Sequence, residues 1–232
     1  MNLFSRFKVL WGPLAELLYP RVCLVCGESL LRGEQYLCTA CLADLPFVYP
    51  QQHIGEHILS QWEDAYRPQQ LYSLFYYNKY SPYKQLIYAI KYRSFRDLGN
   101  YLGTMLGERM EGVCKADCIV PVPLHPKRER KRGFNQALEI AKGINEVLKI
   151  DICGDVLCRV RNNASQTGKN AGERLKNVEH IFELRHPEKL AGRHILLVDD
   201  VITTGATIGE CLRVLCDIEQ ASFSLACLAL TL

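Results

Sequence analysis

Residues 195–207 read ILLVDDVITTGAT, and this stretch decides the fold. The first four residues have the length and composition of a buried parallel strand. Two adjacent carboxylates, Asp199 and Asp200, stand at its carboxyl end, and a hydroxyl-rich loop follows before an apolar-periodic helix over 208–216. A glycine-containing loop that opens a helix favours a phosphate, because it offers free N–H groups and the positive end of the helix dipole.

The same block also predicts a sugar next to that phosphate. The two aspartates would accept hydrogen bonds from sugar hydroxyls or orient water around a metal ion. The phosphate-binding candidates are the loop residues Thr203, Thr204, Gly205, Ala206 and Thr207. Aspartate and threonine are also common at strand ends and helix caps for purely structural reasons, so the context of the motif has to support this interpretation.

Length and composition limit the class of protein. The chain has 232 residues, 48% of them hydrophobic, which is enough for one large domain or a medium domain with a small module. A net charge of +3 gives no global field that would indicate nucleic acid. The eleven cysteines are odd in number and mostly isolated in apolar runs, which is not typical of a secreted disulfide framework. We therefore expect a reducing, cytoplasmic location.

The N-terminal segment, residues 1–20, is apolar but does not predict a membrane anchor. No run of eighteen uncharged apolar residues is present, so we expect no transmembrane helix. Lys8 interrupts the stretch and Glu16 follows soon after, which argues against a signal peptide. The spacing predicts an amphipathic helix that packs on the body of the protein, with membrane or partner docking as the less favoured alternative.

Strand and helix patterns alternate through the rest of the chain. Strands are expected at 71–77, 118–122, 155–160, 181–184, 195–198 and 222–230, and helices at 82–92, 98–110, 134–148 and 208–216. This alternation predicts an α/β fold with a parallel sheet and helices on both faces. We expect residues 1–65 to hold the N-terminal helix, a cysteine module and a connector, and residues 66–232 to form the α/β domain.

Four cysteines form two CxxC pairs, Cys23 with Cys26 and Cys38 with Cys41, separated by eleven residues. Two such pairs can complete a tetrahedron around one metal ion, and four thiolates in a reducing compartment favour a closed, structural zinc site. The alternatives are two redox pairs, two disulfides or an iron–sulfur cluster. His53 and His57 lie four residues apart, but a solvated helix face explains them better than a metal site.

The stretch 119–136, IVPVPLHPKRERKRGFNQ, predicts a strand that ends in a basic loop. Ligands of open α/β sheets bind beyond the carboxyl ends of strands, where this loop and the aspartate loop would meet. The candidates for binding a pyrophosphate or another polyanion are His125, Lys127, Arg128 and Arg132. The alternative is a solvated cationic loop or a localisation-like basic run.

The stretch 159–177 is polar, basic and rich in small residues, without a hydrophobic period. Such a composition is typical of a mobile lid as much as of an ordinary surface loop. As lid residues that would reach the ligand we expect Arg161, Ser165, Gln166 and Arg174.

Taken together, these motifs resemble the ComF family, competence-associated proteins with a type I phosphoribosyltransferase fold. The resemblance covers nearly the whole chain and rests on the paired CxxC module, LIYAIKYR, VPVPLHPKRERKRGFNQA, SQTGKNAGERLKNV and VDDVITTGAT. It implies a zinc-binding N-terminal module and a domain that binds phosphoribosyl diphosphate (PRPP). It also implies a link to natural transformation, in which DNA enters as a single strand.

Carried over to this chain, the resemblance gives each segment a role. Asp199 and Asp200 would hold the ribose hydroxyls, residues 203–207 the 5′-phosphate, the 123–132 loop the pyrophosphate with Mg²⁺, and the Ser165–Gln166 loop would close over the site. Purine-salvage relatives have an acid at the position of Thr203. Because threonine is no carboxylate base, purine salvage is disfavoured and the acceptor stays open.

Two function classes remain. In the first, the protein transfers the phosphoribosyl group of PRPP to an unknown nitrogen acceptor. In the second, it is a non-catalytic protein of the same fold that binds single-stranded DNA or a competence helicase, with affinity that falls steeply with salt.

Overall fold

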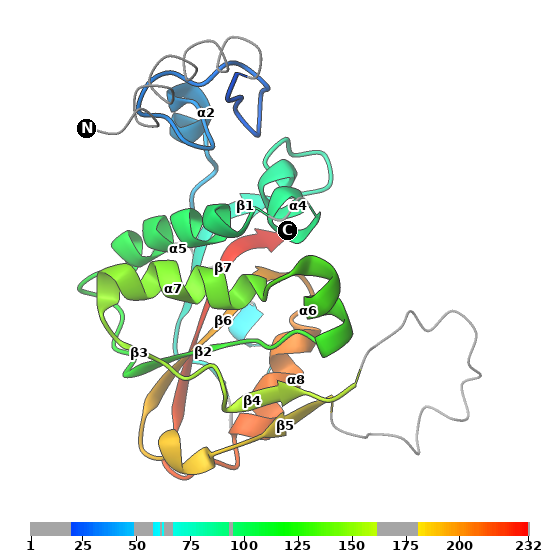
Figure 1. The fold of residues 1–232 in the computed structure, drawn as a ribbon. Coiled ribbons are helices and arrows are strands. Elements are labelled where there is room, and N and C mark those ends of the chain that lie inside the picture. Colours follow the sequence, from blue (N-terminus) through cyan, green and yellow to red (C-terminus); the bar gives the residue numbers. More distant parts are fainter. Residues whose placement is uncertain are drawn as a thin grey trace, which may run out of the picture.

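The computed structural model describes residues 20–48, 58–60, 62, 67–92, 95–161 and 181–231 (Figure 1). Several residues singled out in the sequence lie outside these ranges: the apolar face expected within residues 1–19, His53, His57, and the lid candidates Ser165, Gln166 and Arg174. No helix of the described ranges is long and apolar enough to cross a membrane.

A five-stranded sheet forms the centre of the molecule, and all of its neighbouring strands are parallel. Its order is β1 (Leu71–Tyr77), β7 (Ser222–Thr231), β6 (His194–Ile202), β2 (Cys118–Pro121) and β3 (Asp151–Ile152). The inner strand β7 is buried over eight consecutive residues, as expected for a parallel sheet that is covered on both faces. The α/β fold class expected from the sequence is thus confirmed.

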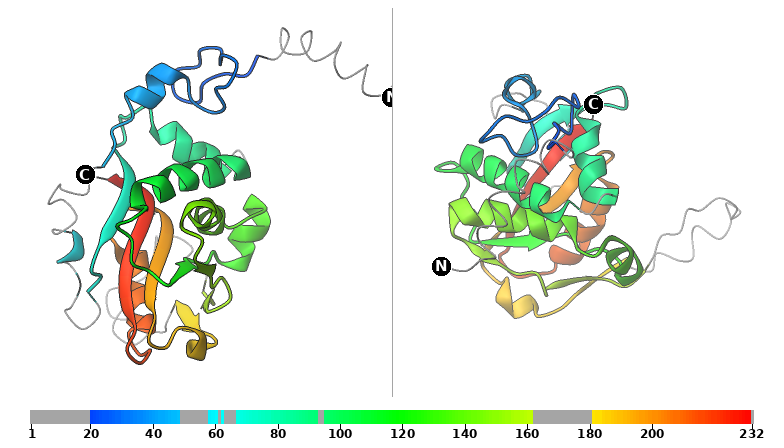
Figure 2. Two further views of the ribbon diagram at one scale, coloured as in Figure 1. Left: turned by 90° about the vertical axis from the view of Figure 1, so that its left-hand side faces the viewer. Right: turned by 45° about the horizontal axis from the view of Figure 1, so that its top comes forward.

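Helices cover both faces of the sheet. One layer contains α4 (Lys84–Tyr92), α5 (Arg96–Met110) and α7 (Gln136–Leu148), and the sheet with this layer beside it is seen in Figure 2. On the other face α8 (Ala206–Leu215) packs together with Trp62. Each layer buries its own apolar cluster against the sheet, which is the main source of stability in such folds.

Glycines let α5 and α7 approach closely. A Cβ atom added at Gly103 would lie 2.3 Å from the carbonyl oxygen of Ile140, and one at Gly143 would lie 2.1 Å from that of Asn100. Both distances are far below van der Waals contact, so the crossing of the two helices depends on these residues having no side chain.

Two local expectations need correction, and one short strand was not expected. The segments at 155–160 and 181–184 do not join the main sheet, because β4 (Leu157–Arg159) and β5 (Phe182–Leu184) pair antiparallel as a separate two-stranded unit. A 3₁₀ turn, η3 (Pro187–Lys189), follows β5. The short β3 was not expected, and its two residues gave no strand pattern to detect.

The basic stretch is also not a loop but a helix, α6 (Pro126–Arg132). His125 caps it, since its Nδ1 accepts a hydrogen bond from the backbone N–H of Lys127 at 3.2 Å. Proline occupies the first helical position, and Gly133 ends the helix in the left-handed region at φ 82°. These helix start and stop signals stand in the sequence at the two ends of the charged stretch.

Residues 20–48 form a compact module on the side of the sheet that carries α4 and α5 (Figures 1 and 2). It contains α2 (Thr39–Ala43) and joins the main core through an isolated bridge between Phe47 and Phe75. The Tyr83 hydroxyl donates to the carbonyl oxygen of Cys41 at 3.0 Å, and the ring of Tyr36 packs 5.3 Å from that of Tyr101. The module is therefore fixed to the residue just before α4 and to α5.

Candidate functional site

The two aspartates lie within β6, which continues to Ile202, rather than after it. Along a strand, successive side chains point to opposite faces. Leu197 belongs to the cluster under α8, and Val198 belongs to the cluster under α4, α5 and α7. Asp199 therefore points to the α8 face and Asp200 to the opposite face.

Asp200 is paired with a lysine that the sequence analysis had not assigned to the site. Lys91, in the last turn of α4, places its Nζ 3.0 Å from Asp200 Oδ1, and both side chains are mostly buried. The backbone N–H of Asp200 donates to Asp199 Oδ1 at 2.8 Å. The stretch LIYAIKYR contains Lys91, but nothing local to it shows that it meets a residue more than a hundred positions away.

Asp199 is an unusually weak acid for an aspartate. Burial, and then the neighbouring Asp200 carboxylate, raise its pKa to about 7, although the hydrogen bond from the Asp200 N–H and the charges of Lys91 and Arg159 act in the opposite direction. Near neutral pH this carboxyl group is therefore divided between its charged and neutral forms, so it can accept or donate a hydrogen bond.

The loop after β6 has the features that a phosphate-binding turn needs. Thr203, Thr204 and Ala206 are exposed and Thr207 is partly exposed, so the loop is accessible to a ligand. Gly205 has φ 70° and stands at the N-cap of α8. An added Cβ there would lie 2.8 Å from Cζ2 of Trp62, so backbone conformation and packing both require glycine at this position.

A cavity of about 440 Å³ opens beside the end of β2. Its lining comes from the 121–126 segment, from α6 and α7, and from the β4 strand: Pro121, Pro123, Leu124, His125, Pro126, Glu129, Asn135, Leu138, Gly154, Leu157, Cys158, Arg159, Val160 and Arg185. Its walls are thus largely apolar, with a few polar groups between them, as is typical of small-molecule sites.

Arg159 is the most informative residue of this cavity. Its Nε is buried and has no hydrogen-bond partner among the residues that the structure describes. The guanidinium lies 5.4 Å from the ring centroid of Phe182, and burial, followed by Arg128, lowers its pKa. An unsatisfied buried donor is costly, so the position calls for an anionic acceptor.

The expected basic residues divide into two groups. His125 lines the cavity, and burial followed by Lys127 lowers its pKa, so its ring is neutral near pH 7. The positive charge of Arg128 lowers the pKa of both His125 and Arg159, so this charge also acts at the cavity. Arg132 points elsewhere: it lies 5.5 Å over the ring of Tyr92 and donates to Gln136 Oε1 at 2.8 Å. Lys127 and the expected lid residue Arg161 are exposed.

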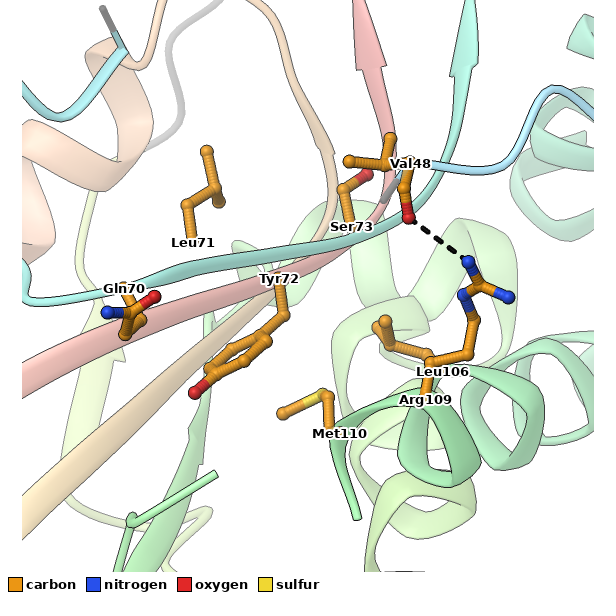
Figure 3. A pocket seen from close by; sticks show the side chains of 8 residues that line it. All are labelled: Val48, Gln70, Leu71, Tyr72, Ser73, Leu106, Arg109 and Met110. Carbon is orange, nitrogen blue, oxygen red and sulfur yellow. Dashed lines mark hydrogen bonds between the residues drawn. The ribbon is translucent and has the colours of Figure 1, made fainter. Parts of the chain in front are cut away.

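A second crevice lies between β1 and α5 (Figure 3). Arg109 crosses it and donates to the carbonyl oxygen of Val48 at 3.2 Å, while its guanidinium lies 4.4 Å from the ring centroid of Phe47. The space of about 30 Å³ admits about one water molecule. This crevice is a structural junction between the N-terminal module and α5, not a second substrate site.

The four predicted metal ligands do converge. The Sγ atoms of Cys23, Cys26, Cys38 and Cys41 lie within 4.8 Å of one another, and those of Cys26 and Cys38 are 3.7 Å apart. Tetrahedral zinc with Zn–S bonds of 2.3 Å requires S···S distances of about 3.8 Å. The donor set therefore fits one closed, structural zinc site.

Backbone groups support the same cluster. The N–H of Cys41 donates to Cys38 Sγ at 3.4 Å. Burial alone would raise the pKa of Cys23, but the N–H groups of Cys26 and Cys38 outweigh it and lower the pKa to about 6. A thiol so stabilised in its charged form is suited to bind a metal ion.

Two family models match the chain. The double zinc ribbon domain matches residues 14–54, and the phosphoribosyl transferase domain matches residues 131–231. The chain is 28% identical to DNA utilization protein YhgH of Escherichia coli K12 over 91% of both chains. It is 29% identical to Competence protein ComFC of Bacillus subtilis, over 87% of this chain and 80% of that one. It is 33% identical to Competence protein F of Haemophilus influenzae, over 50% of this chain and 51% of that one.

Proposed function

We propose, from the premise that this chain belongs to the ComF family, that it binds PRPP together with Mg²⁺ beyond the carboxyl ends of β2 and β6. The observation that carries the proposal is the Nε of Arg159, which lies in the wall of the cavity at that edge and has no hydrogen-bond partner among the described residues. A diphosphate oxygen would satisfy this donor with a charge-assisted hydrogen bond.

Each part of the ligand has a matching part of the site. The exposed hydroxyls and N–H groups of residues 203–207 bind the 5′-phosphate. Asp200 accepts a hydrogen bond from the ribose, and Asp199, on the other face of β6, accepts the hydrogen bond of the Asp200 N–H. Arg159, His125 and Arg128 bind the pyrophosphate. Mg²⁺ prefers oxygen ligands of the kind that the two carboxylates offer, and it would supply charge neutralisation to the diphosphate.

The reaction that suits this site is displacement at C1 of the ribose. A nitrogen nucleophile forms the new C–N bond, the C–O bond to pyrophosphate breaks, and its electron pair leaves with the diphosphate. The protein contributes orientation of the sugar and stabilisation of the leaving charge. Thr203 provides no carboxylate base, so the acceptor must lose its proton to another group.

Isothermal titration calorimetry with Mg·PRPP tests the binding. We expect one site per chain in the parent protein and no detectable binding in the double variant Asp199→Asn with Asp200→Asn. The exposed Asp217→Asn, which also removes a carboxylate, serves as the control and keeps the parent affinity. Equal affinity in the parent and the double variant would refute the assignment. If the parent protein binds Mg·PRPP as expected, a pyrophosphate-release assay with a panel of bases and amines tests for turnover.

A second candidate function is binding of single-stranded DNA, and one observation favours it. Tyr88 and Tyr92 on α4 are 50% and 64% exposed and lie with ring centroids 4.8 Å apart. Arg132 of the basic helix α6 lies over Tyr92. Exposed rings beside cations form a stacking platform for unpaired bases.

Fluorescence anisotropy with labelled single strands at two salt concentrations tests this candidate. We expect affinity that falls with salt and is lost in Tyr88→Ala with Tyr92→Ala, while the exposed Tyr80→Ala retains it. Binding that is absent, or insensitive to salt and to the double substitution, would remove the candidate. If single-stranded DNA binds, the same surface would next be tested for binding of a helicase.

We further propose a cytoplasmic location and a division of the chain near residue 65 into the cysteine module and the phosphoribosyltransferase-like domain. The location is supported by the finding that none of the eleven cysteines, all of which the structure describes, forms a disulfide. The division is supported by the convergence of the four cysteine thiol groups within residues 20–48.

A further inference from the structure

We propose that Lys91 is a positioning residue of the sugar site, which fixes the Asp200 carboxylate so that it selects a ribose by its hydroxyls. This inference rests on the proposed PRPP binding and adds a residue from α4, an element outside the phosphate-binding motif. The geometry behind it is the ion pair of 3.0 Å between Lys91 Nζ and Asp200 Oδ1.

The helix that carries Lys91 is fixed along its length. Leu86, Ile87, Ala89 and Ile90 bury its inner face in the core. Just before its first turn, the Tyr83 hydroxyl donates to the carbonyl oxygen of Cys41 in the cysteine module. Because a helix rises 1.5 Å per residue, Tyr83 and Lys91 stand about 12 Å apart on one rigid element. The ammonium group is thus placed by packing and not by a flexible loop.

The ion pair leaves the carboxylate usable. Lys91 contacts Oδ1, and no other side chain of the described residues forms a hydrogen bond or ion pair with the Asp200 carboxylate. A carboxylate accepts about four hydrogen bonds through its two oxygens, so Oδ2 is left to accept from a sugar hydroxyl. Asp199 points to the other face of β6 and cannot replace it there.

The lysine also matters for charge. PRPP carries several negative charges, and two adjacent carboxylates would repel it. An ammonium 3.0 Å from one of them cancels that charge at the place where the sugar binds. Without Lys91, Asp200 would be a mostly buried acid with no cation from the described residues beside it, and its carboxylate would be free to rotate.

The test uses ribose 5-phosphate and its 2-deoxy and 3-deoxy analogues as calorimetric probes. In the parent protein we expect at least one deoxy analogue to bind about tenfold more weakly than ribose 5-phosphate, because a hydrogen bond to a charged acceptor is lost. In Lys91→Met that preference should fall below about threefold, and Lys91→Arg should retain most of it. Lys91→Gln is a second neutral variant in case the first one folds poorly.

Lys84→Met is the matched control, because it removes the same charge from the same helix at an exposed position and should keep the parent preference. A merely structural role of Lys91 would weaken all three sugars equally and leave their ratio unchanged, and that result would overturn the inference. If the parent protein binds none of the sugars nor Mg·PRPP, the proposed function itself fails, which is a different outcome.

Discussion

The raised pKa of Asp199 predicts how stability depends on pH. Unfolded aspartate has a pKa near 3.9, whereas burial and Asp200 raise it to about 7 in the folded chain. The folded state therefore keeps a proton that the unfolded state releases between about pH 4 and pH 7. The contribution of this carboxyl group is favourable below pH 4 and is lost progressively as the pH rises through 7.

The size of the effect follows from the same two values. Each pH unit within that window costs about 1.4 kcal/mol of unfolding free energy, so about 3 kcal/mol is lost between pH 5 and pH 8. Asp199→Asn does not titrate and avoids the loss. We therefore expect the difference in unfolding free energy between Asp199→Asn and the parent to grow by about that amount over this range.

Urea unfolding of both proteins at pH 5, 6, 7 and 8 measures this difference. Other titrating groups are common to both proteins and cancel. Asp217→Asn, at an exposed position, should run parallel to the parent at every pH. A constant difference between Asp199→Asn and the parent would show that Asp199 is an ordinary acid and would refute the reasoning.

Three further predictions follow from the packing and the two sites. Gly143→Ala should lower the unfolding free energy by about 1–3 kcal/mol, because the new Cβ would lie 2.1 Å from the Asn100 carbonyl oxygen; Gly154→Ala, whose nearest neighbours are 3.9 Å away, should cost little in the same urea titration. Gly205→Ala should weaken Mg·PRPP binding in calorimetry by at least tenfold, because the backbone at φ 70° and the Trp62 ring both resist a side chain; unchanged affinity would argue against this loop as the phosphate site. Removing zinc with a chelator should lower the melting temperature, and Cys26→Ser should reproduce that loss without chelator; an unchanged melting curve would exclude a structural metal.

The central strand was predictable because its signal is local. Residues 195–207 contain an apolar run followed by two acids and a glycine-containing turn, and these features predict β6 and the start of α8. The opposite orientation of Asp199 and Asp200 also follows from strand periodicity, once the strand is known to continue through them. Only its extension to Ile202 was hidden, because the apolar pattern breaks at the acids.

The helix α6 was missed for a different reason. Its five cations offer no apolar face, so hydrophobic periodicity cannot detect it. The helix is indicated instead by its capping residues, His125 and Gly133, which stand at the two ends of the charged stretch.

Long-range contacts account for the rest. Lys91 becomes a site residue only because α4 is packed so that its last turn reaches β6, and Arg159 only because the separate β4–β5 unit places it beside the cavity. Both contacts join residues that are far apart in the sequence, and no repeating pattern links their positions. Neither contact can therefore be predicted from residue spacing.

The most direct test of the account is the affinity of Mg·PRPP for the parent protein and for Arg159→Met. The account predicts one site per chain in the parent and at least tenfold weaker binding in the variant, because a buried charged donor to the diphosphate is lost. Arg185→Met, at the same cavity but without an orphaned buried nitrogen, should lose less. If the well-folded parent protein binds no Mg·PRPP, or if Arg159→Met binds it as tightly as the parent, this cavity is not the PRPP site.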